Sequence, residues 1–328
     1  MNCTYLRKPF AVLGLLGCLL PTLANAQTPA PAWPTKPVKI IVTFPPGGAP
    51  DTLARVLADK WGQATGQTFT VDNKPGAGGN IGSDFVAKSA GDGSTLLIAT
   101  VGTHAINPAL YSAMPFNHIK DFTPVSFLAS TPNLLVVNNA VPAKNVKELI
   151  ALASKTPLTF GSSGSGTSIH LSGELFNTLA GVKMQHIPYK GRAQAVPDLL
   201  GGRITMIFDN MPSALPLVKS GDVRAIAVTS AKRSAAAPDI PTIAESGLPG
   251  FEASSWFALM APAGLPKEVL ARINAETARV LSLPDVREKL TQLGLDVAPG
   301  SPESLASHIQ TETVKWAKVV KESGAKLD

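Results

Sequence analysis

Three glycine-rich segments of this sequence have the composition of anion-binding loops. They span residues 44–51, 74–82 and 161–168, and the last of them, GSSGSGTS, adds several hydroxyl groups. Glycine lets a backbone approach a ligand closely and leaves its N–H groups facing outward. Where such a segment leads into a helix, the first N–H groups of the helix lack partners and carry the positive end of the helix dipole. Each segment is therefore a candidate anion site, with an ordinary turn and helix cap as the alternative.

The same segments do not match the common catalytic and cofactor motifs. Residues 161–168 lack the lysine of a nucleoside triphosphate loop. The glycines at 76, 78 and 82 resemble a dinucleotide fingerprint, but the next strand ends in Thr100, where an acidic residue would contact the ribose. The sequence contains neither a G-x-S-x-G nucleophile elbow nor an H-E-x-x-H zinc motif. It therefore predicts no catalytic residue, no metal site and no cofactor.

Two other positions carry side chains that could contact a ligand. His170 and Glu174 are four residues apart on one helix face, a spacing that fits a pair of metal ligands or, more commonly, a contact within the helix. Asp209 follows the predicted strand 204–208, so it points into a cleft or caps the helix that begins near Pro212. Both readings of Asp209 stay open at the level of sequence.

Alternating strands and helices must position these loops. Their expected positions follow from β-branched runs and from apolar residues at helical spacing. Strands are expected at 38–42, 69–72, 95–100, 134–137, 158–160, 184–187, 204–208, 223–228 and 256–260, and helices at 81–89, 146–153, 168–179, 266–281, 284–293 and 302–320. This alternation predicts an α/β protein with mostly parallel sheets flanked by helices. A second series of elements begins after Thr123-Pro124, which predicts two lobes.

The three helices expected at 266–281, 284–293 and 302–320 determine how often the chain crosses between the lobes. If they pack on the first lobe as surface helices, the chain crosses between the lobes twice. The cleft between the lobes then lies at the carboxyl ends of the strands, where open α/β sheets bind ligands.

Composition and charge narrow the class of protein. Of the 328 residues, 45% are apolar and 16% charged, which excludes a disordered chain or a coiled coil. The formal net charge is +6, but the basic residues are scattered and few aromatic residues accompany them. The sequence therefore does not predict nucleic-acid binding.

The first 26 residues have the features of a secretory signal peptide. Arg7 and Lys8 precede the apolar segment 11–23, and Ala24-Asn25-Ala26 fits a cleavage site. We expect cleavage after Ala26 and a soluble mature protein in the periplasm. A lipoprotein anchored at Cys18 is the alternative. Cys3 and Cys18 are the two cysteines, so the cleaved chain would have no disulfide and no thiol.

An ordered set of motifs resembles the extracytoplasmic solute receptors of the tripartite tricarboxylate transporters, the Bug (TctC) family. The set covers nearly all of the chain after residue 35. Its members are KPVKIIVTFPPGG at 36–48, NKPGAGGNIG at 73–82, NPALY at 107–111, FGSSGSG at 160–166, HIPYKG at 186–191, PTIAE at 241–245 and APAG at 261–264.

The resemblance implies a two-lobed periplasmic binding protein of the type II-like, or Venus flytrap, architecture with two crossover strands. Residues 27–127 and 253–328 would form lobe I and residues 128–252 lobe II. Such a receptor closes on a small carboxylate and delivers it to a two-component integral-membrane permease, without chemistry on the ligand. We expect a monomer. The alternatives are a ligand-sensing receptor for a membrane signalling partner and, with less support, a secreted α/β hydrolase.

The resemblance also implies which residues bind the ligand. The loops 44–51 and 162–168 would clamp a carboxylate, mainly through main-chain N–H groups, hydroxyls and water, so that no lysine or arginine is needed in the cleft. Ala49-Pro50 replaces the glycine-threonine usual in the family, which argues against a side-chain contact at position 50. The predicted ligand-binding residues are Phe44, Pro46, Gly47, Gly48, Asp51, Asn80, Thr100, His104, Ser163, Gly164, Gly166, Thr167, Ser168 and Asp209.

Overall fold

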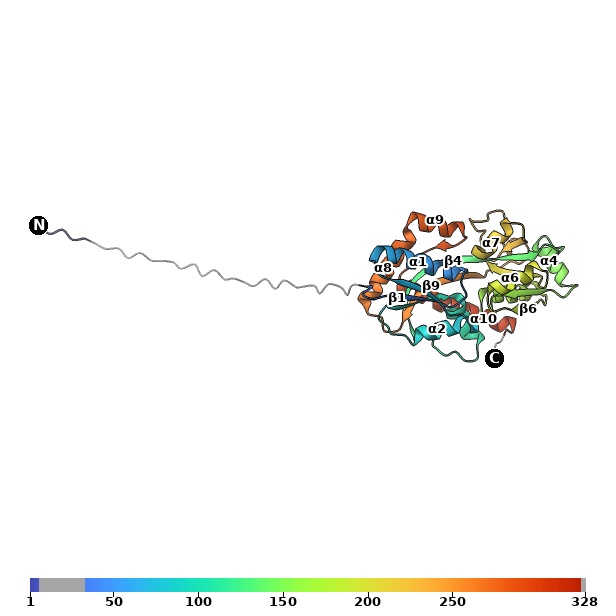
Figure 1. Ribbon diagram of the computed structural model, residues 1–328, viewed down its shortest axis with the longest axis horizontal. Coiled ribbons are helices and arrows are strands. Elements are labelled where there is room, and N and C mark those ends of the chain that lie inside the picture. Colours follow the sequence, from blue (N-terminus) through green and yellow to red (C-terminus); the bar gives the residue numbers. More distant parts are fainter. Residues whose placement is uncertain (6–32, 326–328) are drawn as a thin grey trace. The chain divides into compact units, whose positions relative to one another are not determined.

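The structure is a computed structural model that describes residues 1–5 and 33–325 (Figure 1). The helices and strands that the structure describes lie between residues 33 and 325, which belong to one compact unit. The predicted signal-peptide core, its cleavage site after Ala26 and Cys18 lie outside the described residues. Among the residues that are described, no helix is long and apolar enough to cross a membrane.

The first group of strands has a parallel centre and antiparallel neighbours. β1 pairs in parallel with β2 and β3, and β9 pairs antiparallel with β3 and with the first part of β4, to which β10 also pairs. The bounds are β1 Val38–Val42, β2 Phe69–Asn73, β3 Thr95–Thr100, β4 Phe122–Asn138, β9 Ser254–Pro262 and β10 Asp296–Val297.

Helices cover both faces of this group because its strands are apolar on both faces. Ile40 and Val42 of β1 pack in one core with helices α1, α8 and α9, whereas Ile41 packs in another with α2 and α10. The alternation follows from the two-residue period of a strand. The bounds are α1 Ala49–Thr65, α2 Asn80–Ala87, α8 Lys267–Ser282, α9 Pro284–Gln292 and α10 Pro302–Ser323, with the short turns η1 Ala77–Gly79, η2 Gly102–Ile106 and α3 Asn107–Leu110.

The second group of strands follows the same plan. β5 pairs in parallel with β6 and β7, and the last part of β4 pairs antiparallel with β7 and β8. Helices α4 and α5 pack on one face, and α6 and α7 on the other. The bounds are α4 Val146–Ala153, β5 Thr159–Ser162, α5 Ser168–Ala180, β6 Gln185–Pro188, α6 Arg192–Leu200, β7 Met206–Asn210, α7 Met211–Lys219 and β8 Val223–Val228.

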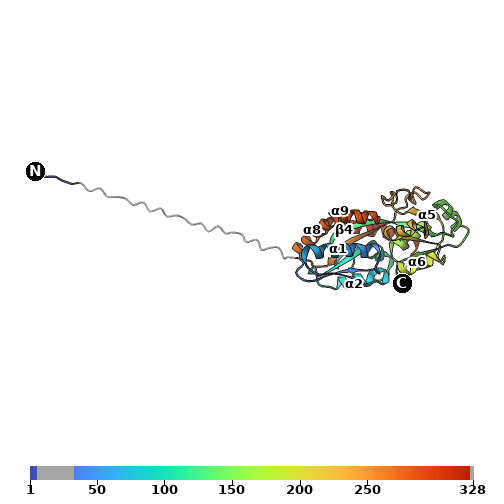
Figure 2. The ribbon, with the colours of Figure 1, turned by 45° about the horizontal axis from the view of Figure 1, so that its top comes forward.

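Strand β4 joins the two groups. Its first part pairs with β9 and its last part with β7 and β8, so this 17-residue strand runs through both lobes. The chain returns just before β9, where the N–H of Ala253 donates to the carbonyl of Thr229. Figures 1 and 2 show α1, α2, α8 and α9 around one end of these strands and α6 toward the other end. The two-lobed α/β fold with two crossover strands is confirmed, and the antiparallel pairings are those of β4 and β9 with their neighbours.

Two sequence-based expectations differ from the structure. A second series of elements was expected to begin after Thr123-Pro124, but these residues lie within β4, where a register shift between Pro124 and Ser126 accommodates the missing N–H of the proline. Helix α10 is more than a surface helix. Its Trp316 is fully buried, and the helix packs against η2 and α3 of one lobe and α5 of the other.

Candidate ligand-binding site

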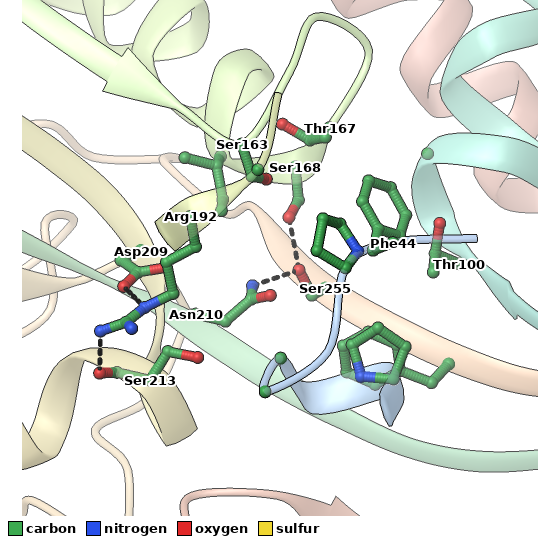
Figure 3. Close-up of a pocket in the computed structure, with 18 of the residues that line it drawn as sticks. Phe44, Thr100, Ser163, Thr167, Ser168, Arg192, Asp209, Asn210, Ser213 and Ser255 are labelled. Atoms are coloured by element: carbon green, nitrogen blue, oxygen red, sulfur yellow. Dashed lines mark hydrogen bonds and ion pairs between the residues drawn. The ribbon is translucent and has the colours of Figure 1, made fainter. Parts of the chain in front are cut away.

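A cavity of about 150 Å³ lies where strands of both lobes end. Its wall is formed by residues 44–48, 50, 100–102, 163, 167–169, 191–193, 209, 210, 213, 255 and 257 (Figure 3). These segments follow β1, β3, β5, β6 and β7 or belong to the start of β9. A cavity of this size holds a molecule about as large as benzene, so it suits a small organic acid.

Four helices begin at the cavity wall. Gly48, Thr167, Gly191 and Asn210 are the residues that precede the first turns of α1, α5, α6 and α7, and all four line the cavity. Each helix N-terminus carries about half a positive elementary charge and unpaired N–H groups. Their convergence makes the cavity favourable for an anion without requiring a free lysine or arginine.

The start of α5 offers main-chain donors to the cavity. The Thr167 hydroxyl accepts a hydrogen bond from the N–H of His170 at 3.3 Å and donates to the carbonyl of Gly164 at 2.7 Å. The N–H groups of Ser168 and Ile169, both at the cavity wall, have no acceptor within the described part of the chain. Capping by Thr167 therefore fixes the helix start and leaves these two donors for a ligand.

Hydroxyl and amide side chains form the floor between the lobes. The hydroxyls of Ser168 and Ser255 are hydrogen-bonded to each other, and Asn210 donates from Nδ2 to the Ser255 oxygen at 2.8 Å (Figure 3). Ser255 is the second residue of β9 and Asn210 is the last residue of β7, so one network joins both lobes. Ser255 and Asn210 were not predicted from the sequence, because only tertiary packing brings them to the cavity wall.

Asp51 braces the first loop from behind. Its Oδ2 accepts from the N–H of Gly47 at 3.0 Å and from Nε of Arg55 at 2.9 Å, and its Oδ1 accepts from Nδ2 of Asn73 at 3.1 Å. Burial alone would raise the pKa of the Asp51 carboxyl, but these hydrogen bonds outweigh it and hold the pKa below its usual value. Asp51 does not line the cavity. It accepts the hydrogen bond of the Gly47 N–H, which the sequence-based prediction had assigned to the ligand.

Arg192 is the cationic residue that the sequence analysis did not anticipate. Its Nε donates to Oδ2 of Asp209 at 2.7 Å, and its Nη2 donates to the carbonyl of Ser213 at 2.6 Å (Figure 3). Burial raises the pKa of the Asp209 carboxyl, and the Arg192 guanidinium opposes that rise. The sequence could have indicated Arg192 as a site residue, because a glycine, Gly191, follows a predicted strand there. Helix α6 itself was not predicted, so its start was not recognised as part of the site.

The 14 predicted ligand-binding residues are only partly brought together. Nine line the cavity: Phe44, Pro46, Gly47, Gly48, Thr100, Ser163, Thr167, Ser168 and Asp209. Pro50 lines it as well, although the sequence argued against a contact there. Gly164 instead lines a neighbouring cavity of about 590 Å³, which shares Phe44, Pro45 and Ser163 with the first.

Asp51, Asn80, His104 and Gly166 line neither of these two cavities. The Asn80 side chain accepts a hydrogen bond from Asn107 at 2.8 Å, and the N–H of Gly166 donates to His170 at 3.3 Å. His104 is fully buried in the turn η2, beside Phe122, and burial lowers its pKa to about 3. The side chains of Asn80 and His104 and the N–H of Gly166 therefore make contacts behind the cavity wall and do not line the cavity.

The third glycine-rich loop, 74–82, belongs to the neighbouring cavity. Residues 75–79 face residues 163–165 and 188–190 across it. The His170–Glu174 pair is a contact within α5, with Nε2 and Oε1 at 3.5 Å. Within residues 1–5 and 33–325 there is no group of three or more side chains that could hold a metal ion.

A two-lobed α/β shell with a donor-lined cleft at the strand ends is the architecture of a periplasmic binding protein. Residues 53–325 match the family described as "Tripartite tricarboxylate transporter family receptor". The chain therefore belongs to this family of solute-binding receptors, also known as Bug receptors, as its motif order predicted.

Relatives of known name or structure extend the likeness over nearly the whole chain. Protein BugT of Bordetella pertussis is 38% identical over 320 residues, which cover 96% of this chain and 98% of BugT. A Rhodopseudomonas palustris protein solved with adipate is 41% identical with a TM-score of 0.88, covering 90% of this chain and all of that one. MatC from the same organism, solved with malate, is 34% identical with a TM-score of 0.83, covering 88% of this chain and all of MatC.

Proposed function

We propose that this receptor captures a small organic acid in the cavity between its lobes and delivers it to a two-component membrane permease. The observation that carries the proposal is the convergence of four helix starts on one cavity, whose wall includes Ser168 and Ile169 with N–H groups that have no acceptor in the described part of the chain. The adipate and malate complexes of the two similar proteins support the same ligand chemistry.

The available donors are sufficient for a useful affinity. A hydrogen bond to a charged group contributes about 1.5 to 3 kcal/mol. Three or four such bonds, less the cost of ordering the ligand, reach the roughly 8 kcal/mol of a micromolar complex. Neutral donors also suit delivery, because opening of the lobes would return water to them and weaken the hold on the anion.

We also propose how the chain divides into two lobes. Lobe I would comprise residues 27–127 and 253–328 and lobe II residues 128–252, with β4 and the start of β9 as the connections. Strand pairing supports this division, because β1, β2 and β3 pair with one another and β5, β6 and β7 do so separately. Cleavage after Ala26 would release the mature monomer to the periplasm.

Calorimetry of the mature protein with a panel of organic acids tests the ligand class. Wild-type protein is expected to bind at least one small carboxylate at micromolar concentration and to leave it chemically unchanged. Ser168→Ala should weaken that binding about tenfold or more, because it removes a hydroxyl from the cavity wall. Thr178→Ala is the matched control, because it removes an exposed hydroxyl farther along the same helix.

Two results would overturn the proposal. One is that the protein is folded but no carboxylate in the panel gives a heat of binding or raises its melting temperature. The other is turnover of the bound acid, which would make the protein an enzyme. Delivery to a permease is tested separately by uptake of the labelled acid in cells that lack this receptor, where uptake should fall.

A further inference from the structure

The cavity has two chemically different ends. In Figure 3, Phe44 and Thr100 lie at one end, and Arg192, Asp209 and Ser213 lie at the other, with Ser168 and Ser255 between them. Among the described residues that line the cavity, Arg192 and Asp209 are the charged ones. Neutral donors thus serve the middle of the cavity, and the only full charges of its wall are gathered at one end.

The guanidinium of Arg192 is fixed in place and only partly used. Asp209 holds Nε and the Ser213 carbonyl holds Nη2, at 2.7 and 2.6 Å. An arginine has five N–H donors, so these two bonds leave three. The Arg192 side chain is 30% exposed, whereas that of Asp209 is 4% exposed. The carboxylate is therefore enclosed behind the arginine, whose remaining donors stay accessible.

We propose that Arg192 is the specificity-determining residue of this site, selecting acids that carry a second anionic group opposite the one bound at the start of α5. Asp209 is a positioning residue that orients the guanidinium. The inference rests on the proposed function and sharpens it from carboxylates in general to dicarboxylates.

Desolvation explains why Arg192 would select. A ligand that closes the cavity removes water from the unused N–H groups of the guanidinium, which is costly unless they gain new acceptors. A second carboxylate supplies these acceptors as a charge-assisted, often bidentate pair. The methyl end of a monocarboxylate supplies none, and an ammonium group would be repelled by the like charge.

Asp209 does not cancel this selectivity because of where it binds. It pairs with the Nε edge of the guanidinium, whereas Nη1 lies away from that edge and has no acceptor in the part of the chain that the structure describes. The ion pair therefore stabilises a buried carboxylate and a defined arginine rotamer together. Losing Asp209 would leave Arg192 charged and held by the Ser213 carbonyl alone.

Adipate and hexanoate provide a matched test, since both have six carbons and differ in the second carboxylate. Isothermal titration should show that the wild-type protein binds adipate at least tenfold tighter than hexanoate. Arg192→Gln should weaken adipate binding at least tenfold and should not weaken hexanoate binding, which no longer has to desolvate a guanidinium, so that the preference disappears. Arg203→Gln, which removes an arginine paired with Asp198 on the same lobe, is the control and should keep the preference.

The positioning role of Asp209 is tested with dicarboxylates of four to eight carbons. Wild-type protein should show one preferred length, and Asp209→Ala should flatten that preference while an acid still binds. An unchanged length ranking in Asp209→Ala would refute the positioning role.

Other outcomes separate this inference from the proposed function. If Arg192→Gln changes both affinities equally or neither, Arg192 does not select. Hexanoate binding also reports that the variant is folded. If the wild-type protein binds no acid of either series, the carboxylate-receptor proposal itself fails.

Discussion

Residues 74–82 and 161–168 are two glycine-rich loops with the same pattern in the sequence and different uses in the structure. Both follow a strand and lead into a helix. The 161–168 loop leaves the N–H groups of Ser168 and Ile169 at the cavity wall. In the 74–82 loop, the N–H groups of Gly79 and Ile81 donate to the Gly76 carbonyl at 2.9 and 3.5 Å.

The glycines of the 74–82 loop serve close packing. A Cβ on Gly82 would lie 2.8 Å from the Lys74 carbonyl oxygen, and one on Gly78 would lie 2.8 Å from the Ser165 carbonyl oxygen in the opposite loop. Both distances are too short for real side chains. Glycine content therefore does not distinguish the loops, because a Cβ on Gly166 of the 161–168 loop would also collide with a neighbour. The difference lies in the N–H groups of Ser168 and Ile169, which only the hydrogen bonds of the folded chain reveal.

The largest effect is expected from Gly166→Val in the 161–168 loop. Gly166 has a φ of +82°, its N–H donates to His170, and a Cβ would collide with the Asn107 amide oxygen. The substitution should displace the loop and abolish carboxylate binding measured by calorimetry.

Gly181→Val is the matched control for backbone strain. Gly181 ends α5 with a φ of +67°, and a Cβ there has nothing within 4 Å. It should cost about 1 to 2 kcal/mol of stability and leave ligand affinity intact. Equal affinities in Gly166→Val and wild type would contradict a ligand role for the 161–168 loop.

A smaller effect is expected from Gly78→Ala in the other loop. The added methyl group meets the Ser165 carbonyl across the cleft, so it should hinder the approach of the two loops and lower affinity about tenfold without touching the ligand. Gly66→Ala is its control, with a similar φ of +69° and open space around the Cβ. If both alanine variants bind equally well, the 74–82 loop has no part in closure.

Much of the fold was predictable because it depends on local pattern. The strands around Ile40 and Leu97 and the helices opened by Pro284 and Pro302 are close to their expected positions. The long strand β4 was not predicted in full, because Pro124 and Pro132 normally interrupt strands and are tolerated here beside register shifts and at the crossing between lobes.

The site was less predictable than the fold. Loops at strand ends can be recognised from glycine and serine, and nine of the predicted residues do line the cavity. Arg192, Asn210 and Ser255 were missed because their roles depend on contacts between distant segments, such as the Asn210–Ser255 hydrogen bond. Asp51 and His104 were misplaced for the converse reason. A polar residue near such a loop can hold the loop in place through hydrogen bonds instead of lining the cavity, and the sequence does not distinguish the two roles.

The smallest effect on binding, and the sharpest difference between the two loops, is expected from a change of pH. Nε2 of His186 lies 2.6 Å from the Ser162 hydroxyl, which also accepts from the Gly164 N–H at 3.2 Å. His186 stacks on Phe160 and on His170, which in turn pairs with Glu174. The 74–82 loop is instead held by Asn107, whose amide does not titrate.

Burial, with the nearby His170, lowers the pKa of His186 to about 3 from a usual 6.5. A histidine that is neutral when folded stabilises the protein fully above pH 6.5, and this contribution is lost as the pH falls from 6.5 toward 3. The loss is at most about 1.4 kcal/mol per pH unit for one proton. Hydrogen exchange, corrected for intrinsic rates, should show the 161–168 loop losing protection between pH 7.5 and 5 before the 74–82 loop does.

His186→Gln should remove the pH dependence that belongs to this histidine, because glutamine can keep the hydrogen bond to Ser162 but cannot take up the proton. Its ligand affinity at pH 7.5 should match that of the wild-type protein, since His186 is neutral there and lies outside the cavity wall. An unchanged pH slope in the variant, or equal loss of protection in both loops, would show that His186 does not control the 161–168 loop. The two glycine-rich loops would then differ in hydrogen bonding alone and not in their response to protons.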